Sequence, residues 1–270
     1  GAWEQLAAEG KAGRGAQPPP AAAGFDTGAP LGSDVRSMES KVQLLRAFGQ
    51  ALPDAAVLSP ALLRGRPSAP FVHLMPAFDS WASGNVEVPS AATAEKPFAS
   101  RIDRAVWRGV PSGGRADGSL RGKVVGSCQG EPWADVSFVS EANRLSRDAQ
   151  AAYKVLLLVD GNAWASSWEW ALASGSVVVW VGVWWLHLHE ELVPWPQRGA
   201  HYVPADLSNL EERVRWVLDH PDEGAAIAER ARKLFARAAT PAHSRAYVAR
   251  MFATLADRNP KGDLEIKRIK

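Results

Sequence analysis

The residues of this chain that could do chemistry are arginines and glycines with the spacing of an anion-binding loop. Arg108-Gly109 is followed, after three residues, by Gly113-Gly114-Arg115. Glycine lets backbone N–H groups approach an anion closely, and arginine supplies a forked, permanently charged donor. These residues therefore predict a cradle for a diphosphate group. An exposed glycine-rich loop without a ligand is the alternative explanation.

A second candidate anion site is the turn of residues 161–167, which we expect to open a helix. The first N–H groups of a helix have no intrahelical partner, and the helix dipole adds partial positive charge at that end. Trp164 in this turn could stack on a nucleotide base or pack on a sheet. Core packing is the better explanation for four tryptophans that follow it, namely Trp168, Trp170, Trp180 and Trp184.

One cluster has the residue types of a metal site but not the spacing. His187 and His189 are followed by Glu190 and Glu191. On a helix the two histidines would point to different faces, and only His187 and Glu191 would share one, so a solvated helical face explains the cluster better. The sequence also lacks a Walker loop, a dinucleotide-binding glycine motif, a nucleophile elbow and zinc-finger spacing. We therefore expect no metal and no resident cofactor.

Two apolar runs would position the second candidate site. Residues 155–159 end at the turn 160–162, and another run begins at Val177. Such runs are typical of strands buried on both faces, and a helix-length segment between them indicates a parallel pair with a right-handed crossover. Because ligands bind outside the carboxyl ends of such strands, the loop around Gly161 is the expected site. A shorter strand is expected at residues 105–107.

The chain after residue 200 is predicted to be helical. Ser208 and Glu211 have the spacing of a capping box, Asp222 could cap the next helix, and a third helix is expected around Tyr247 and Met251. With the parallel sheet, this predicts an α/β fold with a helical C-terminal flank. The apolar positions that recur at helical spacing are Leu207, Leu210, Val214, Val217 and Leu218, then Ile227, Ala231, Leu234 and Phe235.

The composition of the chain limits the classes of protein to which it can belong and indicates how it is divided into segments. It has 270 residues, 46% of them hydrophobic, and a net charge of +2, which excludes a strongly basic nucleic-acid-binding protein. Residues 1–36 are rich in Ala, Gly and Pro and are predicted to be disordered, whereas residues 259–270 form a basic tail. Between them we expect a partial N-terminal lobe at 37–104 and a larger lobe at 105–258. No membrane span or signal peptide is recognisable, and because residue 1 is Gly rather than Met, we expect a fragment or a trimmed product.

Several ordered motifs resemble one family of enzymes. They are Y-K-V-L-L-L-V-D-G-N-A-W from Tyr153, L-A-S-G-S-V-V-V from Leu172, E-L-V-P-W from Glu191, H-Y-V-P from His201 and D-L-S-N-L-E-E from Asp206. Upstream, Val106-Trp107-Arg108-Gly109 and Leu52-Pro53-Asp54 are similar to two further elements of that family. The chain resembles the Rumi-like protein O-glucosyltransferases, which include the fungal capsule-associated (CAP) xylosyltransferases and plant and algal members, and it looks most like a plant or algal one.

The resemblance implies a two-lobed GT-B fold, with a UDP-sugar donor bound by the C-terminal lobe without a metal. Glucose or xylose would pass to a hydroxyl group of a protein or glycan, with a carboxylate as general base, in the lumen of the endoplasmic reticulum or Golgi. Without a metal, arginines and helix N-terminal amides must stabilise the leaving diphosphate. Arg121 is a further candidate for that role. The residues expected to bind the donor are Arg108, Gly109, Arg115, Arg121, Gly161, Asn162, Ala163, Trp164, Ser166 and Ser167.

The chain departs from the family pattern in three places. The catalytic Asp of the family follows its Leu-Pro-Asp element, but residues 55–67 contain no acid, and Asp79, the next carboxylate, is not assigned the role. Ser167 stands where animal members have an arginine, and residues 196–200 are an insertion. The catalytic residue therefore stays unassigned. A non-enzyme that still binds a nucleotide sugar and a helical interaction module built on residues 207–235 are the two alternatives.

Overall fold

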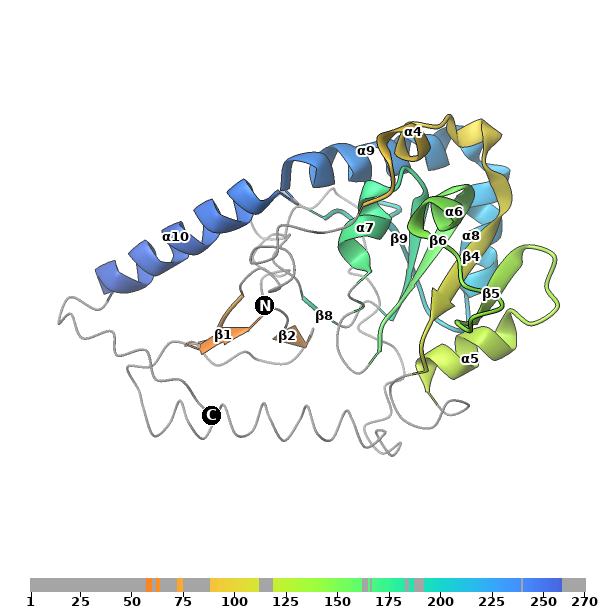
Figure 1. Ribbon diagram of the computed structural model, residues 1–270, viewed down its shortest axis with the longest axis horizontal. Coiled ribbons are helices and arrows are strands. Elements are labelled where there is room, and N and C mark those ends of the chain that lie inside the picture. Colours follow the sequence, from red (N-terminus) through yellow and green to blue (C-terminus); the bar gives the residue numbers. More distant parts are fainter. Residues whose placement is uncertain are drawn as a thin grey trace.

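Five parallel strands form the central sheet in the computed structural model of the protein (Figure 1). Their order across the sheet is β5-β4-β6-β7-β9. The neighbouring strands β6 and β7 are the two apolar runs, so the predicted parallel pair and the α/β class are confirmed. The strands are β4 (Ile102–Gly109), β5 (Ala134–Phe138), β6 (Tyr153–Val159), β7 (Val177–Val181) and β9 (Val203–Ala205).

The structure describes a little over half of the chain. Several predictions lie outside this part, among them the disordered segment 1–36 and the basic tail 259–270. The described residues are 57–59, 62–63, 72–74, 88–111, 119–161, 165, 167–182, 185–186, 192–238 and 240–258.

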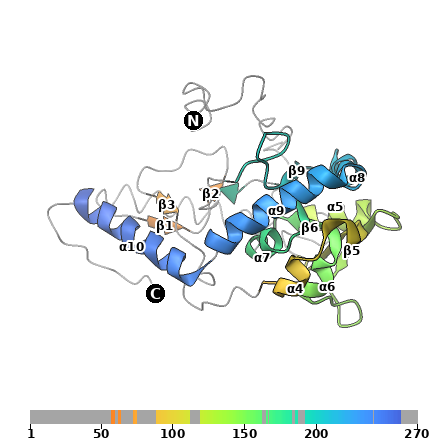
Figure 2. The ribbon, with the colours of Figure 1, turned by 90° about the horizontal axis from the view of Figure 1, so that it is seen from above.

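Helices follow or precede the strands of the sheet, and Figure 2 shows α9 running along it and α10 extending beyond it. They are α4 (Ala91–Ala94), η1 (Phe98–Ser100), α5 (Leu120–Ser127), α6 (Arg147–Ala151), α7 (Trp168–Ala173), α8 (Leu210–Asp219), α9 (Pro221–Ala238) and α10 (Pro241–Arg258). Two further strand pairs are present, the parallel β1 (Val57–Ser59) with β3 (Val72–Leu74) and the antiparallel β2 (Leu62–Leu63) with β8 (Trp185–Leu186). None of the described helices combines the length and hydropathy that a membrane crossing requires.

Helices cover both faces of the sheet, which explains why its central strands are apolar throughout. On β6, Val155, Leu157 and Val159 face a cluster that includes side chains of α5 and α8, whereas Leu156 and Leu158 face one built with α7 and the second half of α9. All five are at most 4% exposed, and fully burying one such side chain contributes about 1.5–3 kcal/mol. Because successive side chains of a strand point to opposite faces, the one apolar run of β6 contributes to the hydrophobic cores on both faces of the sheet.

The helix caps differ from those that the sequence predicts. The cap of α8 is Asn209, not Ser208, because the Ser208 hydroxyl donates to the Asp206 carboxylate at 2.5 Å and so stabilises the preceding turn. The next helix, α9, begins at Pro221, which places Asp222 within its first turn rather than at the cap. Proline suits the first helical position because its missing N–H would have no helical partner there.

Arg101 joins three helix ends at the amino edge of the sheet. It is only 4% exposed, and its guanidinium donates to carbonyl groups at the ends of α4, α6 and α7. A positive charge at helix C-termini is stabilised by their dipoles and satisfies carbonyls that have no helical partner. The acceptors are the carbonyl oxygens of Thr93, Ala94, Lys96, Ala151 and Ser174 and the hydroxyl of Ser176.

Gly175 makes room for this junction. Its φ is +76°, and a Cβ atom there would lie 2.2 Å from the carbonyl oxygen of Ala94 and 2.7 Å from Nη2 of Arg101. The flanking Ser174 and Ser176 hydroxyls donate to Ala171 and to Tyr153 at 2.6 and 2.8 Å. The S-G-S motif of this chain is therefore a structural element, and it lies at the edge opposite the carboxyl ends of the strands.

Candidate functional site

The candidate site lies where the strand order changes direction. β4 comes first in the chain among the five strands, and its two neighbours are β5 and β6, the second and third. The connecting helices α5 and α7 therefore pack on opposite faces of the sheet. At such a switch point the carboxyl ends of the two adjacent strands leave a crevice that binds ligands. By this rule the candidate ligand site lies between the ends of β4 and β6, and we call this region the crevice.

Arg121 connects the two sides of the crevice. Its Nε and Nη2 groups donate to the carbonyl oxygen of Val159 at 3.3 and 3.2 Å, and its Nη1 group donates to that of Val110 at 3.0 Å. These bonds use three of the five guanidinium N–H groups. The other two have no partner among the residues that the structure describes, so a ligand could accept from them.

The position of Arg121 in its helix also favours an anion. α5 begins at Leu120 after the cap Ser119, so Arg121 occupies the first turn, where no acidic residue is present. A cation in the first turn opposes the helix dipole, which costs about 0.3–1 kcal/mol at exposed positions. The helix dipole and the guanidinium thus place positive charge at the same end, and an anionic ligand there would interact favourably with both.

The Trp107 ring packs against the guanidinium of Arg121. It is 5% exposed, its ring meets Phe138 edge to face at 6.0 Å, and Arg121 lies over it at 5.7 Å from the ring centroid. Gly109 leaves the space that this ring occupies, because a Cβ atom there would lie 2.3 Å from Cζ2 of Trp107. The Trp-Arg-Gly element of the sequence therefore shapes the end of β4 through its first and third residues.

Replacing Gly109 with alanine is expected to destabilise the protein by about 1–3 kcal/mol, the usual cost of overpacking a core. The added methyl would force Trp107 to move, whereas at Gly126 an added Cβ meets nothing within 4 Å. Gly126→Ala in α5 is the matched control and should stabilise by up to about 1 kcal/mol through helix propensity. Thermal unfolding of both variants measures the difference. Equal melting temperatures would contradict the packing of Trp107 on Gly109.

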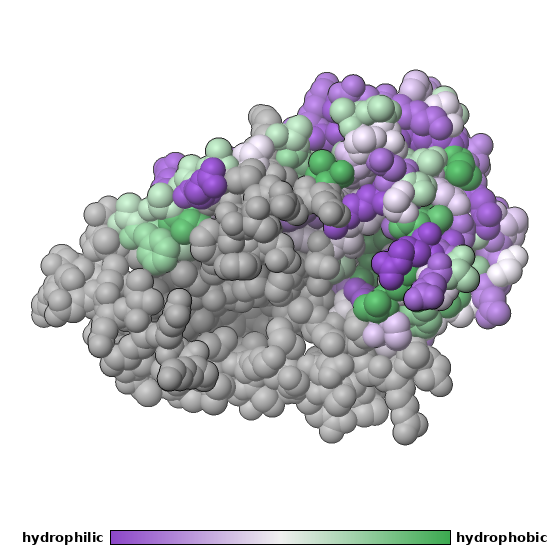
Figure 3. Space-filling view, in the orientation of Figure 1, coloured by the Kyte–Doolittle hydropathy of each residue, from purple (hydrophilic) through white to green (hydrophobic). Residues whose placement is uncertain are grey.

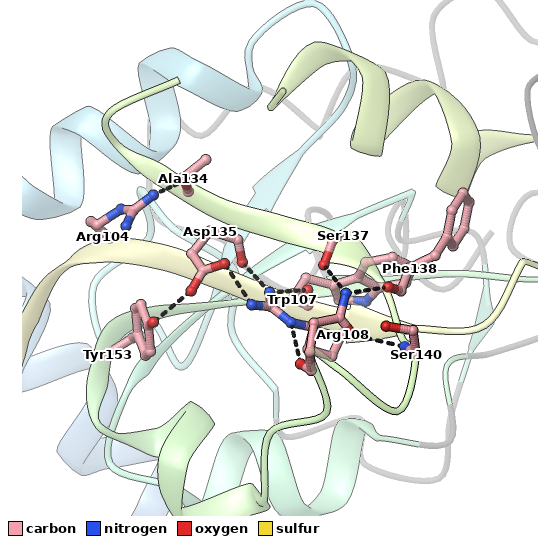
Figure 4. A network of polar contacts seen from close by, with 10 residues as sticks. Arg104, Trp107, Arg108, Ala134, Asp135, Ser137, Phe138, Ser140 and Tyr153 are labelled. Atoms are coloured by element: carbon pink, nitrogen blue, oxygen red, sulfur yellow. Dashed lines mark hydrogen bonds and ion pairs between the residues drawn. The ribbon is translucent and has the colours of Figure 1, made fainter. Parts of the chain in front are cut away.

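The Arg108 side chain is held by groups of the fold itself, and its role in donor binding stays a prediction. Its Nε group donates to the Asn143 carbonyl at 3.0 Å and its Nη1 group to the Asp135 carbonyl at 2.7 Å (Figure 4). Nη1 also donates to its neighbour Trp107, and Nη2 pairs with the Asp135 carboxylate at 2.6 Å. Four of its five N–H groups are thus used within the fold. Arg108 joins β4 to β5, and Arg121 is the described arginine at the crevice.

The carboxylate that holds Arg108 is itself stabilised in its charged form. Burial by itself would raise the pKa of the Asp135 carboxyl, but hydrogen bonds from Tyr153 and Arg108 and the charge of Arg104 lower it below its ordinary value. Tyr153 donates to Asp135 at 2.6 Å from the neighbouring β6, and Arg104 donates to the Ala134 carbonyl (Figure 4). The whole network therefore joins the neighbouring strands β4, β5 and β6.

The remaining predicted site residues follow β6. Gly161 continues the chain from the end of this strand, and Ser167 is the N-terminal cap residue of α7, although its side chain makes no capping bond. Both lie on the carboxyl side of the sheet, as predicted. Arg115, Asn162, Ala163, Trp164 and Ser166 lie outside the described residues.

No metal site is found in the part of the chain that the structure describes, where no three His, Cys, Asp or Glu residues come together. The cluster 187–191 and Asp79 lie outside that part. Cys128 is 2% exposed, and burial raises the pKa of its thiol to about 11, so it is no nucleophile at neutral pH.

Residues 196–200, which the sequence resemblance suggests as an insertion, form a turn that precedes β9. Arg230 of α9 donates to the Ala200 carbonyl at 2.8 Å, and the Trp195 ring packs against Trp216 of α8 at 4.6 Å between centroids. Trp195 is also covered by Arg213 at 4.7 Å. This turn and the preceding Trp195 thus contact α9 and α8, and an isolated parallel bridge joins Pro194 to Tyr202.

Comparisons with known proteins identify one family. The family described as Glycosyl transferase family 90 matches residues 74–259 of the chain. A relative from Danio rerio, Protein O-glucosyltransferase 2, is 39% identical over 79 residues, which cover 28% of this chain and 15% of the relative. The matched part thus spans a small fraction of that protein. Among solved structures, a sucrose-phosphate synthase (tll1590) from Thermosynechococcus elongatus gives a TM-score of 0.45 at 14% identity, over 72% of this chain and 55% of the synthase.

Proposed function

Since the chain belongs to glycosyl transferase family 90, we propose that it transfers glucose or xylose from a UDP-sugar to a hydroxyl group of a protein or glycan, without a metal ion. The observation that carries the proposal is Arg121 at the switch point of the sheet. Its guanidinium and the N-terminus of α5 supply positive charge at the end of β4, where a diphosphate would bind.

The proposed reaction is a substitution at the anomeric carbon of the donor sugar. The oxygen of the acceptor hydroxyl forms a new bond to that carbon, the bond to the β-phosphate oxygen breaks, and UDP leaves with the electron pair. A carboxylate takes the proton of the hydroxyl as general base. Positive groups that are fixed before the reaction stabilise the charge that develops on the diphosphate, and Arg121 is proposed to act in this way. Arg115, Asn162, Ala163, Trp164 and Ser166 remain proposed donor contacts.

The general base is not assigned to a residue. The segment where the family has its catalytic Asp, residues 55–67, contains no acid. This observation favours a second candidate function, namely a protein that binds the nucleotide sugar but does not transfer the sugar. The donor site is common to both candidates, so donor binding and sugar transfer have to be measured separately.

The helical interaction module is the less favoured alternative. Its apolar side chains on α8 and α9 lie in the core: Val214 and Val217 are 0% exposed, and Phe235 is 1% exposed. They pack on the sheet and are not available to a partner. On the face shown in Figure 3, hydrophobic residues over the described domain appear as separate spots among hydrophilic ones. We further propose the lumen of the endoplasmic reticulum or Golgi as the location, as the sequence resemblance implies.

Release of UDP from UDP-glucose and UDP-xylose tests the proposed chemistry. The purified chain is incubated with each sugar nucleotide, with and without EDTA, and the UDP released by transfer of the sugar to water, which takes the place of the acceptor hydroxyl, is quantified over time. An enzyme of the proposed kind releases UDP from at least one donor at a rate that EDTA does not change. A chain that binds UDP but releases none from either donor supports the second candidate function instead.

A further inference from the structure

Asp160 is a fully buried carboxylate at the candidate site. It follows β6 directly and is 0% exposed. Taking an ionised carboxylate out of water is costly unless hydrogen bonds and charges compensate for the lost hydration. The residue was expected only as part of a turn. Its burial at the switch point therefore calls for compensating contacts.

The Asp160 carboxylate joins three elements around the crevice. Its Oδ1 atom accepts from the Trp180 indole of β7 at 3.1 Å and from the Ala165 N–H at 3.4 Å. The carbonyl of Ala165 in turn accepts from Trp168 at 3.1 Å, so the same contact holds the start of α7. Asp160 itself donates from its backbone to Val181 at 3.2 Å. One side chain thus fixes the end of β6, the end of β7 and the start of α7.

Gly182 leaves space for this carboxylate next to α5. Its φ is +108°, and a Cβ atom there would lie 3.2 Å from Oδ2 of Asp160 and 3.3 Å from Cδ2 of Leu120. The carboxylate therefore lies close to the first turn of α5, which carries Arg121. Burial lowers the pKa of the Arg121 guanidinium, and the negative charge of Asp160 opposes that shift. The two groups stabilise each other's charge across the crevice.

We propose that Asp160 is a positioning residue of the donor site, which holds the start of α7 and the charged end of α5 in the arrangement that binds the donor's diphosphate. The inference rests on the proposed function, because it assumes that a diphosphate binds at this crevice. Asp160 does not contact the reacting atoms in this account. It acts through Ala165 and Arg121.

The Asp160→Asn variant distinguishes a positioning role of Asp160 from a direct effect of its charge, because the two predict opposite changes in the affinity for UDP. Removing a negative charge near an anion strengthens binding if charge alone matters. If Asp160 positions the site, losing a charged acceptor weakens the binding of UDP by about tenfold, because a hydrogen bond to a charged group contributes about 1.5–3 kcal/mol. Calorimetric titration of the full chain with UDP and with uridine measures both. The positioning role predicts a higher dissociation constant for UDP, a smaller change for uridine and an unchanged number of sites.

A merely structural role would lower the number of binding sites, since part of the protein would be unfolded, and leave the dissociation constant unchanged. That result, or tighter UDP binding, overturns the inference while the proposed function stands. If the wild-type chain does not bind UDP, the proposed function fails and the inference with it. Asp219→Asn, at the exposed end of α8, is the control and should bind as the wild type does.

Trp180→Phe keeps the experiment decisive if Asp160→Asn does not fold. It removes one donor to the carboxylate but leaves its charge and the contact to Ala165. A rise of the UDP dissociation constant by about tenfold, the lower end of the range for a hydrogen bond to a charged group, is the expected result. A dissociation constant equal to that of the wild type would then count against the positioning role.

Discussion

Arg121→Ala is expected to weaken UDP binding by about a hundredfold and to leave the fold intact. A charged hydrogen bond contributes about 1.5–3 kcal/mol, and two N–H groups of this guanidinium are available to the diphosphate. The protein itself should lose little stability, because the hydrogen bonds of this side chain that the structure describes reach just two carbonyl groups, those of Val110 and Val159. Calorimetric titration with UDP gives the affinity, and thermal unfolding gives the stability.

Arg108→Ala is the matched comparison, since it also removes an arginine side chain, in this case one that lies at the end of β4. Its guanidinium is bound to Asp135 and to carbonyls of the fold, so the variant should unfold at a lower temperature but bind UDP almost as the wild type does. The opposite pattern, with UDP binding lost in Arg108→Ala and kept in Arg121→Ala, would show that the wrong arginine has been assigned to the diphosphate.

Arg101→Ala is expected to destabilise the protein by at least about 4 kcal/mol, since each buried acceptor left without a donor costs about 1–3 kcal/mol. This guanidinium donates to six acceptors, of which the carbonyls of Thr93 and Ala151 also accept from another donor and the other four depend more strongly on it. Typical domains are stable by only about 5–15 kcal/mol, so most of the stability would be lost. Urea unfolding at equilibrium measures the effect.

Arg104→Ala is the control for this prediction. Arg104 lies on β4, three residues after Arg101, but its described hydrogen bond reaches only the Ala134 carbonyl. Its loss should therefore cost no more than about 1–2 kcal/mol. If the two variants unfold at the same urea concentration, the junction of helix ends does not depend on Arg101.

The sequence predicts the centre of the fold well because burial on both faces leaves a clear signal. The apolar runs in β6 and β7 are separated by a helix-length segment, which is typical of parallel strands buried on both faces. By contrast, β5 reads A-D-V-S-F and lies at the edge of the sheet, where polar residues are tolerated. The helix α5 contains two glycines and a basic first turn, so neither periodicity nor capping marks it clearly.

Part of the candidate site could also be predicted from the sequence, because its place depends on where these apolar strands end. The rule that ligands bind beyond the carboxyl ends of parallel strands needs only the strand ends, and it predicts that Gly161, which follows β6, belongs to the candidate site. The role of Arg108 could not be predicted, because its partner Asp135 lies on a strand that the sequence does not indicate. Asp160 was recognised as a turn residue, but whether a carboxylate after a strand is solvated or buried depends on packing by Trp180 and Gly182.

Calorimetric titration of the purified chain with UDP, with and without EDTA, tests the central claim most directly. A metal-independent donor site at the end of β4 and β6 predicts one binding site with a dissociation constant in the micromolar range that EDTA does not change. A folded chain that does not bind UDP, or one whose binding EDTA abolishes, would contradict the account.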